Sequence, residues 1–292
     1  DGLSFTKIAS LRPDPFPVQV LDPVFVTGLG LVSPWFAGNY HKDGGNSWGI
    51  LVSTDDGRTW EQRTIESNLP VKEWVTESSI VSLGNGRILL IGRCEQGLGT
   101  QFQVTSTDGG KTWTKARTNI GDVRESTPSL IYDPKTGLVA NYYYHRGARK
   151  LKRRVAKADF IFTHPDAWPE PEVLAEGFEP RIYDAGNVKA TRLQGKTDCC
   201  AWYTGTQSNA TVVVSVVPYG STSAIKKVVC LTQRRRDAEV FWGQRDPRQT
   251  HALINLDMLA GDRKMKKIAL MVMMATMALE ATAAVRVSLD AT

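Results

Sequence analysis

The sequence predicts an all-β fold: a β-propeller of about four blades over residues 1–220, followed by a tail of different composition over residues 221–292. Three observations carry this prediction. An eight-residue motif occurs twice with the spacing of a propeller blade, glycine-turn hairpins recur with nearly the same spacing, and the composition changes near residue 220.

The repeated motif has the pattern S-x-D-x-G-x-T-W and occupies residues 53–60 and 106–113, which lie 53 residues apart. Each copy follows a short apolar run that is typical of a strand. In such a turn the aspartate accepts hydrogen bonds from nearby backbone N–H groups, and the glycine supplies a positive φ. The tryptophan returns on the next strand and packs against its neighbour.

The predicted hairpins are two apolar runs joined by a turn that contains glycine, and they lie at residues 24–34, 79–93, 129–144 and 188–203. Two hairpins per period give about four strands per repeat, which is the content of a propeller blade. The start of the chain, Gly2-Leu3-Ser4-Phe5, resembles the end of the motif. We therefore expect the chain to begin inside a blade, with earlier blades preceding Asp1.

Composition excludes several other classes of protein. A mean hydropathy of −0.25 over 292 residues does not fit a multi-span membrane protein. The four cysteines form no CxxC pair, the four histidines show no metal-ligand spacing, and no nucleotide-binding glycine motif is present. Most of the net charge of +6 lies in residues 221–292, so we expect no nucleic acid partner. We expect no metal, no cofactor and a monomer.

The two motifs resemble Asp boxes, also called BNR repeats, which are the hallmark of the sialidase (neuraminidase) superfamily. The resemblance covers about residues 1–220 and implies a β-propeller of the six-bladed sialidase type, here with about four blades. It also implies that the boxes are structural turns on the outer rim of the blades. The box residues are Ser53, Asp55, Gly57, Trp60, Ser106, Asp108, Gly110 and Trp113.

Residues 77–93 resemble the sialidase stretch E-x-S-V-V-x-L-x-x-G-R-x-L-x-x-x-R. In that family the leading glutamate polarises a nucleophilic tyrosine, and the closing arginine is one of three that bind the carboxylate of sialic acid. The resemblance therefore assigns these roles to Glu77 and Arg93. We expect both side chains to face the central funnel of the propeller.

The next blade offers a second arginine. Ala156 lies 50 residues after Ser106 and takes the place of the box serine, and the resemblance places a carboxylate-binding arginine two residues earlier, at Arg154. Arg153 would then face the opposite side of the strand. The alternative is a solvated basic hairpin, because residues 146–157 are rich in Lys and Arg.

The last blade offers the nucleophile. Tyr183 precedes the predicted strand at residue 188, and the resemblance assigns it the role of the catalytic tyrosine; the alternative is a core tyrosine. Glu125 precedes a strand as Glu77 does and is the second candidate for the catalytic glutamate. The family's first triad arginine and its acid/base aspartate match no stretch of the chain, and we expect them upstream of Asp1.

The resemblance implies an exo-α-sialidase, a glycoside hydrolase that removes terminal sialic acids with retention through a tyrosine-linked intermediate, and we expect impaired activity in this chain. One alternative is a non-catalytic glycan-binding propeller, and another is a hydrolase for a different acidic sugar. The expected partners are sialylated glycans or other acidic sugars. We expect a secreted or extracytoplasmic protein.

The tail contains a segment at residues 264–284 that is similar to a secretory signal peptide, with basic residues, an apolar run over 268–279 and small residues. The run is shorter than the roughly 20 residues of a membrane span, so we do not expect membrane contact through it. We interpret residues 221–292 as a read-through extension, partly helical. The alternative is an amphipathic helix packed on the propeller.

Overall fold

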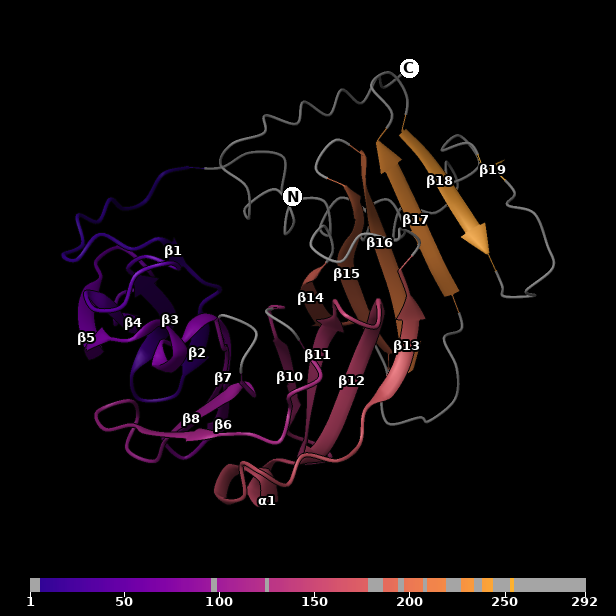
Figure 1. The fold of residues 1–292 in the computed structure, drawn as a ribbon. Helices are drawn as coiled ribbons and strands as arrows, with labels where there is room; N and C mark the ends of the chain where they lie inside the picture. The colour runs from indigo at the N-terminus through magenta and orange to yellow at the C-terminus, as the bar shows by residue number, and fades with distance from the viewer. Residues whose placement is uncertain are drawn as a thin grey trace.

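The structure is a computed structural model, and it describes residues 6–95, 99–123, 126–177, 186–193, 197–206, 209–218, 227–233, 238–243 and 253–254. These residues form four antiparallel sheets arranged one after another along the chain (Figure 1). The described part of the chain is thus an all-β propeller arrangement of four blades, as the sequence predicts. No helix within these ranges is long and apolar enough to cross a membrane.

The first and second sheets follow the predicted hairpins. The first contains β1 (Gln19–Val20), β2 (Val24–Val26), β3 (Gly30–Ala37), β4 (Asn46–Ser53) and β5 (Glu61–Leu69). After the short 3-10 helix η1 (Val71–Glu73), the second contains β6 (Thr76–Gly84), β7 (Arg87–Arg93), β8 (Phe102–Ser106) and β9 (Thr114–Arg117). The hairpins β2–β3 and β6–β7 confirm the first two turn predictions.

The third and fourth sheets confirm the remaining strands. The third contains β10 (Ser129–Asp133), β11 (Leu138–His145), β12 (Lys150–Lys157) and β13 (Glu172–Glu176), with α1 (Ala158–Thr163) between the last two strands. The fourth contains β14 (Gly186–Arg192), β15 (Thr197–Thr206), β16 (Asn209–Pro218), β17 (Lys227–Gln233), β18 (Ala238–Gly243) and β19 (Leu253–Ile254). The turn predicted at residues 195–196 is not among the described residues.

The fourth sheet runs beyond residue 220, where the sequence analysis expects the propeller to stop. β17 pairs with β16 and β18 pairs with β17, both antiparallel. The physical reason is that a propeller blade has four strands, and β17 is the fourth after β14, β15 and β16. The described strands between 227 and 254 thus belong to the sheet of the last blade. The segment 264–284, with its apolar run 268–279, lies outside the described residues, so its helical character stays a prediction.

Apolar side chains fill the space between neighbouring sheets. In the described residues, one cluster joins the first and second sheets, a second joins the second and third, and a third joins the third and fourth. Trp48 and Trp74 are fully buried in the first of these clusters, and Trp202 is fully buried in the third. Burial of such large rings contributes much of the stability of each junction.

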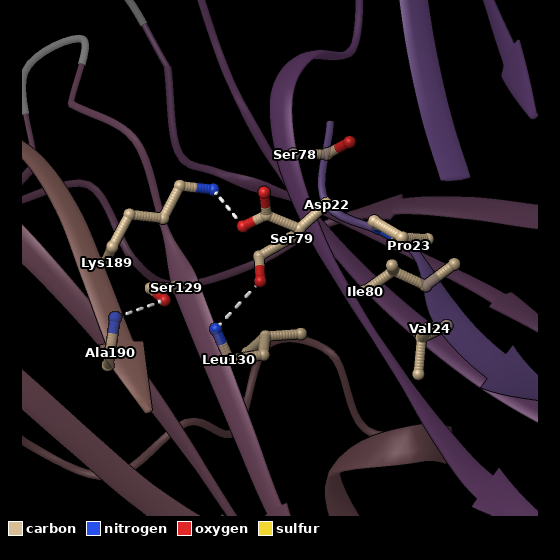
Figure 2. A pocket seen from close by; sticks show the side chains of 10 residues that line it. All are labelled: Asp22, Pro23, Val24, Ser78, Ser79, Ile80, Ser129, Leu130, Lys189 and Ala190. Atoms are coloured by element: carbon tan, nitrogen blue, oxygen red, sulfur yellow. Dashed lines mark hydrogen bonds and ion pairs between the residues drawn. The ribbon is translucent and has the colours of Figure 1, made fainter. Parts of the chain in front are cut away.

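The inner strands β2, β6, β10 and β14 line a small polar cavity of about 180 Å³ (Figure 2). The hydroxyl of Ser79 accepts a hydrogen bond from the backbone N–H of Leu130 at 2.9 Å, and the hydroxyl of Ser129 accepts one from Ala190 at 2.9 Å. The same serine contact thus links two successive pairs of blades. Lys189, which takes the corresponding place in β14, forms an ion pair with Asp22 at 2.6 Å, so the first and fourth sheets meet beside this cavity.

The two repeated motifs form the same turn. The hydroxyl of Ser53 accepts from the N–H of Gly57 at 2.8 Å, and Asp55 accepts from the N–H of Thr59 at 2.8 Å. The second motif repeats both contacts, at 2.8 Å and 2.9 Å. Gly57 and Gly110 share a φ of 84°, and the indoles of Trp60 and Trp113 donate to the carbonyl oxygens of these glycines. The turn chemistry expected from the sequence is confirmed.

The third blade has lost this turn, but its register is preserved. Ala156 pairs with Val139 as Ser106 pairs with Ile88, which confirms that Ala156 takes the serine's place. Without a hydroxyl at 156 the motif cannot close, and the chain continues into α1 instead. This register fixes which residues of the third blade correspond to core residues of the second blade.

Candidate functional site

Glu77 lies at the start of β6, where the strand is irregular. Thr76 pairs with Arg93 and Ser79 pairs with Ile91, so two residues of β6 face Gly92 alone, which is a β-bulge. Glu77 has a φ of 37°, an uncommon value for a residue with a side chain. A Cβ on Gly92 would collide with the side chain of Val75, so the bulge also needs a glycine opposite it. Strain of this kind is found where a strand aims a side chain toward a functional site.

Arg93 ends β7 and meets Glu77 directly. Its Nη1 lies 2.5 Å from Oε2 of Glu77, and its Nη2 lies 2.9 Å from Oε2 of Glu95. The side chains of Arg93 and Glu77 keep 13% and 16% of their surface exposed. Burial alone would lower the pKa of Arg93, but the charges of Glu77 and Glu95 outweigh it and raise that pKa. The structure therefore brings together two of the four residues expected in the site.

Glu95 is the innermost member of this cluster, with only 4% of its side chain exposed. Its carboxylate also accepts a hydrogen bond from the hydroxyl of Thr76, the residue paired with Arg93. Burial raises the pKa of Glu95, although Arg93 and the Thr76 hydroxyl oppose the shift. Glu95 could not be predicted from the sequence, because no motif position corresponds to it.

Tyr40 adds an aromatic side to the cluster. Its hydroxyl donates to Oε1 of Glu77 at 3.4 Å, and the guanidinium of Arg93 lies 5.9 Å from the centre of its ring. The ring packs against Phe36 and Trp74 at centroid distances of 6.2 Å and 5.4 Å. Burial, followed by the charge of Glu77, raises the pKa of Tyr40 well above its usual value, so the phenol is protonated at neutral pH. Its loop carries no pattern from which this contact could be predicted.

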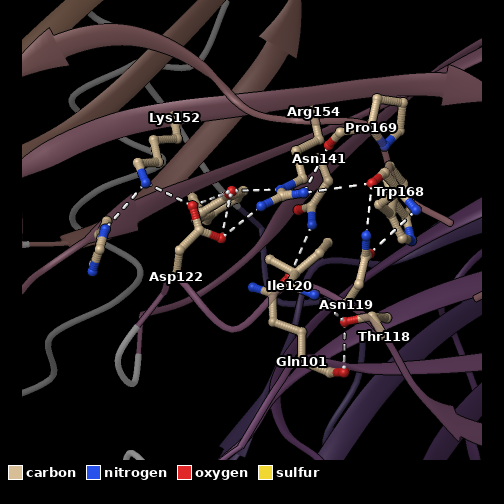
Figure 3. Close-up of polar contacts among 12 residues, drawn as sticks. Gln101, Thr118, Asn119, Ile120, Asp122, Asn141, Lys152, Arg154, Trp168 and Pro169 are labelled. Atoms are coloured by element: carbon tan, nitrogen blue, oxygen red, sulfur yellow. Dashed lines mark hydrogen bonds and ion pairs between the residues drawn. The ribbon is translucent and has the colours of Figure 1, made fainter. Parts of the chain in front are cut away.

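Arg154 lies elsewhere and has other partners (Figure 3). It pairs with Asn141 across the third blade, and by the register of Ala156 these two residues occupy the places of Val104 and Leu90 in the core of the second blade. The side chain of Arg154 is 5% exposed. Arg154 is thus an interior residue between the second and third blades, whereas sequence analysis expects it in the funnel beside Glu77 and Arg93.

Every nitrogen of the Arg154 guanidinium is engaged. Nη2 lies 2.8 Å from Asp122, Nε donates to the hydroxyl of Tyr143 at 2.8 Å, and Nη1 donates to the carbonyl oxygen of Pro169 at 2.7 Å (Figure 3). Lys152 also pairs with Asp122, at 2.6 Å. Burial alone would raise the pKa of Asp122, but Lys152 and Arg154 hold it below its usual range. This network fastens the third blade to the segment that connects it with the second blade.

Arg153 confirms the alternation of the strand, because it faces the fourth blade. Its Nη2 pairs with Glu172 at 2.6 Å, and its Nη1 donates to the carbonyl oxygen of Pro218 at 2.9 Å. Residues 152–154 of this basic run are therefore buried and paired with other groups of the protein. They do not form the solvated hairpin that was the alternative.

Arg146 is a functional candidate that sequence analysis missed. It follows β11, and its guanidinium lies beside the first residue of β14: a Cβ built on Gly186 would be 3.5 Å from both Nε and Nη2 of Arg146. Gly186 directly follows the segment 178–185, which carries Tyr183. Tyr183 and Glu125 lie outside the described residues, so the meeting of Tyr183 with Glu77 stays a prediction.

Metal binding finds no support in the described residues, where no group of three or more His, Cys, Asp or Glu side chains could hold an ion. What the cluster at Glu77 can do chemically is bind and orient. It presents a guanidinium, two carboxylates and a protonated phenol next to one another at the end of the blade where β6 begins and β7 ends.

Solved structures with a similar fold include a protein of unknown function from Dyadobacter fermentans. It is 20% identical over 68% of this chain and 52% of that chain, with a TM-score of 0.52. The α-L-arabinofuranosidase PaAbf62A from Podospora anserina, in complex with cellotriose, is 10% identical over 75% and 70% of the two chains, with a TM-score of 0.50. NanB with optactamide is 17% identical over 69% and 27%, with a TM-score of 0.43.

The first two similarities show a shared fold. Because the identities are below 25%, they show the fold alone. The chain spans about half the length of the Dyadobacter fermentans protein. No protein-family model matches the sequence, and no curated protein matches it.

Proposed function

We propose that this chain is part of a sialidase-type glycoside hydrolase, which removes terminal sialic acids from glycoconjugates with retention of configuration. The observation that carries the proposal is the contact of Glu77 with Arg93 at 2.5 Å, at the end of the blade where β6 begins. These are the two residues whose spacing matches the sialidase stretch. The hydrogen bonds that the two Asp-box motifs share support the same family.

Hydrolysis of a sialoside needs a neutral nucleophile, a base and a carboxylate-binding cation, and the proposed residues supply them. Sialic acid carries a carboxylate on its anomeric carbon, so a carboxylate nucleophile would be repelled and a neutral phenol is preferred. A free tyrosine has a pKa of about 10 and is a weak nucleophile at neutral pH, so it needs a neighbouring base. In this proposal Glu77 is that base, Tyr183 is the nucleophile and Arg93 binds the substrate carboxylate through paired charge-assisted hydrogen bonds.

Arg146 replaces Arg154 in this proposal as the second carboxylate-binding arginine. Arg154 lies in the blade interior, away from Glu77 and Arg93, with each of its guanidinium nitrogens engaged. Arg146 lies beside Gly186, at the junction that leads to Tyr183. A guanidinium at this junction and another at Arg93 would approach a carboxylate from two neighbouring blades.

A glycan-binding propeller without catalysis is the second candidate. The observation that favours it is the mutual pairing of Glu77 and Arg93, which occupies both groups in the free protein. A hydrolase for another acidic sugar would need the same carboxylate-binding arginine. An assay with different acidic glycosides distinguishes it from a sialidase. PaAbf62A, named as an arabinofuranosidase, has the same fold, and glycoside hydrolysis on such a fold is in line with both hydrolase proposals.

The test is an assay of the full chain with a fluorogenic sialoside and with a panel of other acidic glycosides. We expect slow release of sialic acid, in line with the impaired activity expected from the sequence, which is lost in Tyr183→Phe and reduced in Glu77→Gln. Arg63→Lys is the control for a partly exposed arginine in an ion pair. Binding of sialosides without turnover would support the glycan-binding candidate. Turnover that is equal in the wild type and in Tyr183→Phe would contradict the proposed mechanism.

A further inference from the structure

Glu95 lies two residues after Arg93, at the buried side of its guanidinium. Its carboxylate is buried, it lies 2.9 Å from Nη2 of Arg93, and it accepts a hydrogen bond from the hydroxyl of Thr76. Thr76 in turn pairs with Arg93 across β6 and β7. Glu95 is thereby tied both to the arginine side chain and to the strand that faces it.

The guanidinium of Arg93 has a carboxylate partner on each side, and the two partners differ in their exposure to solvent. Glu77, on Nη1, is the more exposed of its two partners, and Glu95, on Nη2, is the more buried. The Nε–H of Arg93 is buried and has no hydrogen-bond partner in the described part of the chain. A guanidinium has five N–H donors in a rigid fork, so one side can stay fixed while the other exchanges partners.

An incoming carboxylate competes with Glu77 and not with Glu95. It needs the accessible N–H groups of Arg93, which Glu77 occupies in the free protein. Once Glu77 is displaced, an arginine without another anchor would lose its orientation, because its long side chain has several rotatable bonds. Glu95, fixed by Thr76, supplies that anchor.

We propose that Glu95 is a positioning residue, which holds Arg93 in place while an acidic ligand takes over the side released by Glu77. The proposal rests on the proposed function of Arg93 as a carboxylate-binding residue. Glu77 and Glu95 thus have different roles toward the guanidinium of Arg93. The ion pair with Glu77 breaks when the ligand binds, and the ion pair with Glu95 is kept.

The first experiment needs no activity. Arginine side-chain NMR of the ¹⁵N-labelled full chain, with Arg93 assigned through Arg93→Lys, reports whether its guanidinium is immobilised. We expect separate Nη signals of Arg93 in the wild type and in Glu77→Gln, where Glu95 still holds it, and averaged signals in the double variant Glu77→Gln/Glu95→Gln, where neither carboxylate holds it. Glu172→Gln, which removes the partner of Arg153, is the matched control and leaves Arg93 unchanged.

Thr76→Val is the second variant, useful if Glu95→Gln does not fold. It removes the hydrogen bond to Glu95 without touching Arg93, and combined with Glu77→Gln we expect partial averaging of the Arg93 signals. Signals that remain separate in Glu77→Gln/Glu95→Gln, or in Glu77→Gln/Thr76→Val where the first double variant is unfolded, would overturn the proposal.

The second experiment uses the sialoside assay. We expect Glu95→Gln to raise KM about tenfold with a much smaller change in kcat, whereas Glu77→Gln lowers mainly kcat. Glu95→Asp, which keeps the charge, should recover part of the loss. An unchanged KM in folded Glu95→Gln would overturn the positioning role. If the wild type neither binds nor cleaves acidic glycosides, the proposed function fails, and the NMR experiment still decides the role of Glu95.

Discussion

Arg93 and Arg154 are arginines in neighbouring blades, the first partly buried and the second buried, and their surroundings differ. Arg93 ends a strand, retains an unpaired Nε–H in the described residues, and has a partly exposed partner in Glu77. Arg154 lies within a strand, in the place of a core valine, and all three of its nitrogens have partners. An arginine at a strand end can bind a ligand, whereas an arginine in the blade interior stabilises the fold.

The largest effect expected from this comparison is on stability. Arg154→Met should lower the free energy of unfolding by about 3 kcal/mol, because it leaves Asp122 with Lys152 as its one cationic partner and removes the donor to the carbonyl oxygen of Pro169. Urea denaturation followed by circular dichroism measures it. Arg63→Met, which removes an exposed partner of Glu61, is the control and should cost less than about 1 kcal/mol. Equal losses in the two variants would contradict the interior role of Arg154.

The next effect is on function. Arg93→Lys keeps the charge but loses the fork that binds a carboxylate on two N–H groups, so kcat/KM for a sialoside should fall about 100-fold. The steady-state rate, normalised to folded protein, is the measurement. Arg154→Lys is the matched variant, and its folded fraction should keep most of the wild-type rate. A greater loss in Arg154→Lys than in Arg93→Lys would reverse the assignment of the two arginines.

A smaller effect concerns the two motif turns. Ser53→Ala and Ser106→Ala should each cost about 1–2 kcal/mol, because each removes the acceptor of a buried backbone N–H. Since the hydrogen bond from the glycine N–H to the serine hydroxyl has the same length in both motifs, thermal unfolding should give nearly equal losses. Ala156→Ser in the third blade should bring no matching gain, as no closing turn follows it. A stabilised Ala156→Ser would show that a turn can form there.

The smallest effect is a pH dependence. Hydrogen bonds from Thr59, first its backbone N–H and then its hydroxyl, lower the pKa of Asp55 to about 2. A lowered pKa stabilises the fold above the unfolded value, near 3.9, and this contribution is lost as pH falls from about 4 to 2. The melting temperature of Asp55→Asn should therefore depend less on pH in this window than that of the wild type. Parallel curves for the two proteins would argue against the contribution.

The sequence predicts the fold better than it predicts the site, for a physical reason. Hairpins and motif turns depend on residues close together in the chain, and Ser53 with Gly57 or Ser106 with Gly110 can be recognised from spacing. The contact of Glu77 with Arg93 lies within one hairpin and follows from the same kind of pattern.

Other parts of the site depend on residues far apart in the sequence. Arg154 meets Asp122 from 32 residues away, and Tyr40 meets Glu77 from 37 residues away. Neither partner stands in a repeated position, so spacing alone could not pair them. The outer strand β17 of the last blade was missed because its residues carry none of the repeat motifs. Once the register is known, the burial of Arg154 follows from its correspondence with Val104.

The most direct test of the central claim is an NMR titration of the full chain with N-acetylneuraminic acid, observing the side-chain Nε–H groups of Arg93 and Arg154. The account predicts a saturable shift of the Arg93 signal and an unchanged Arg154 signal. A shift of Arg154 with Arg93 unaffected, or saturable binding that leaves both signals unchanged, would contradict it.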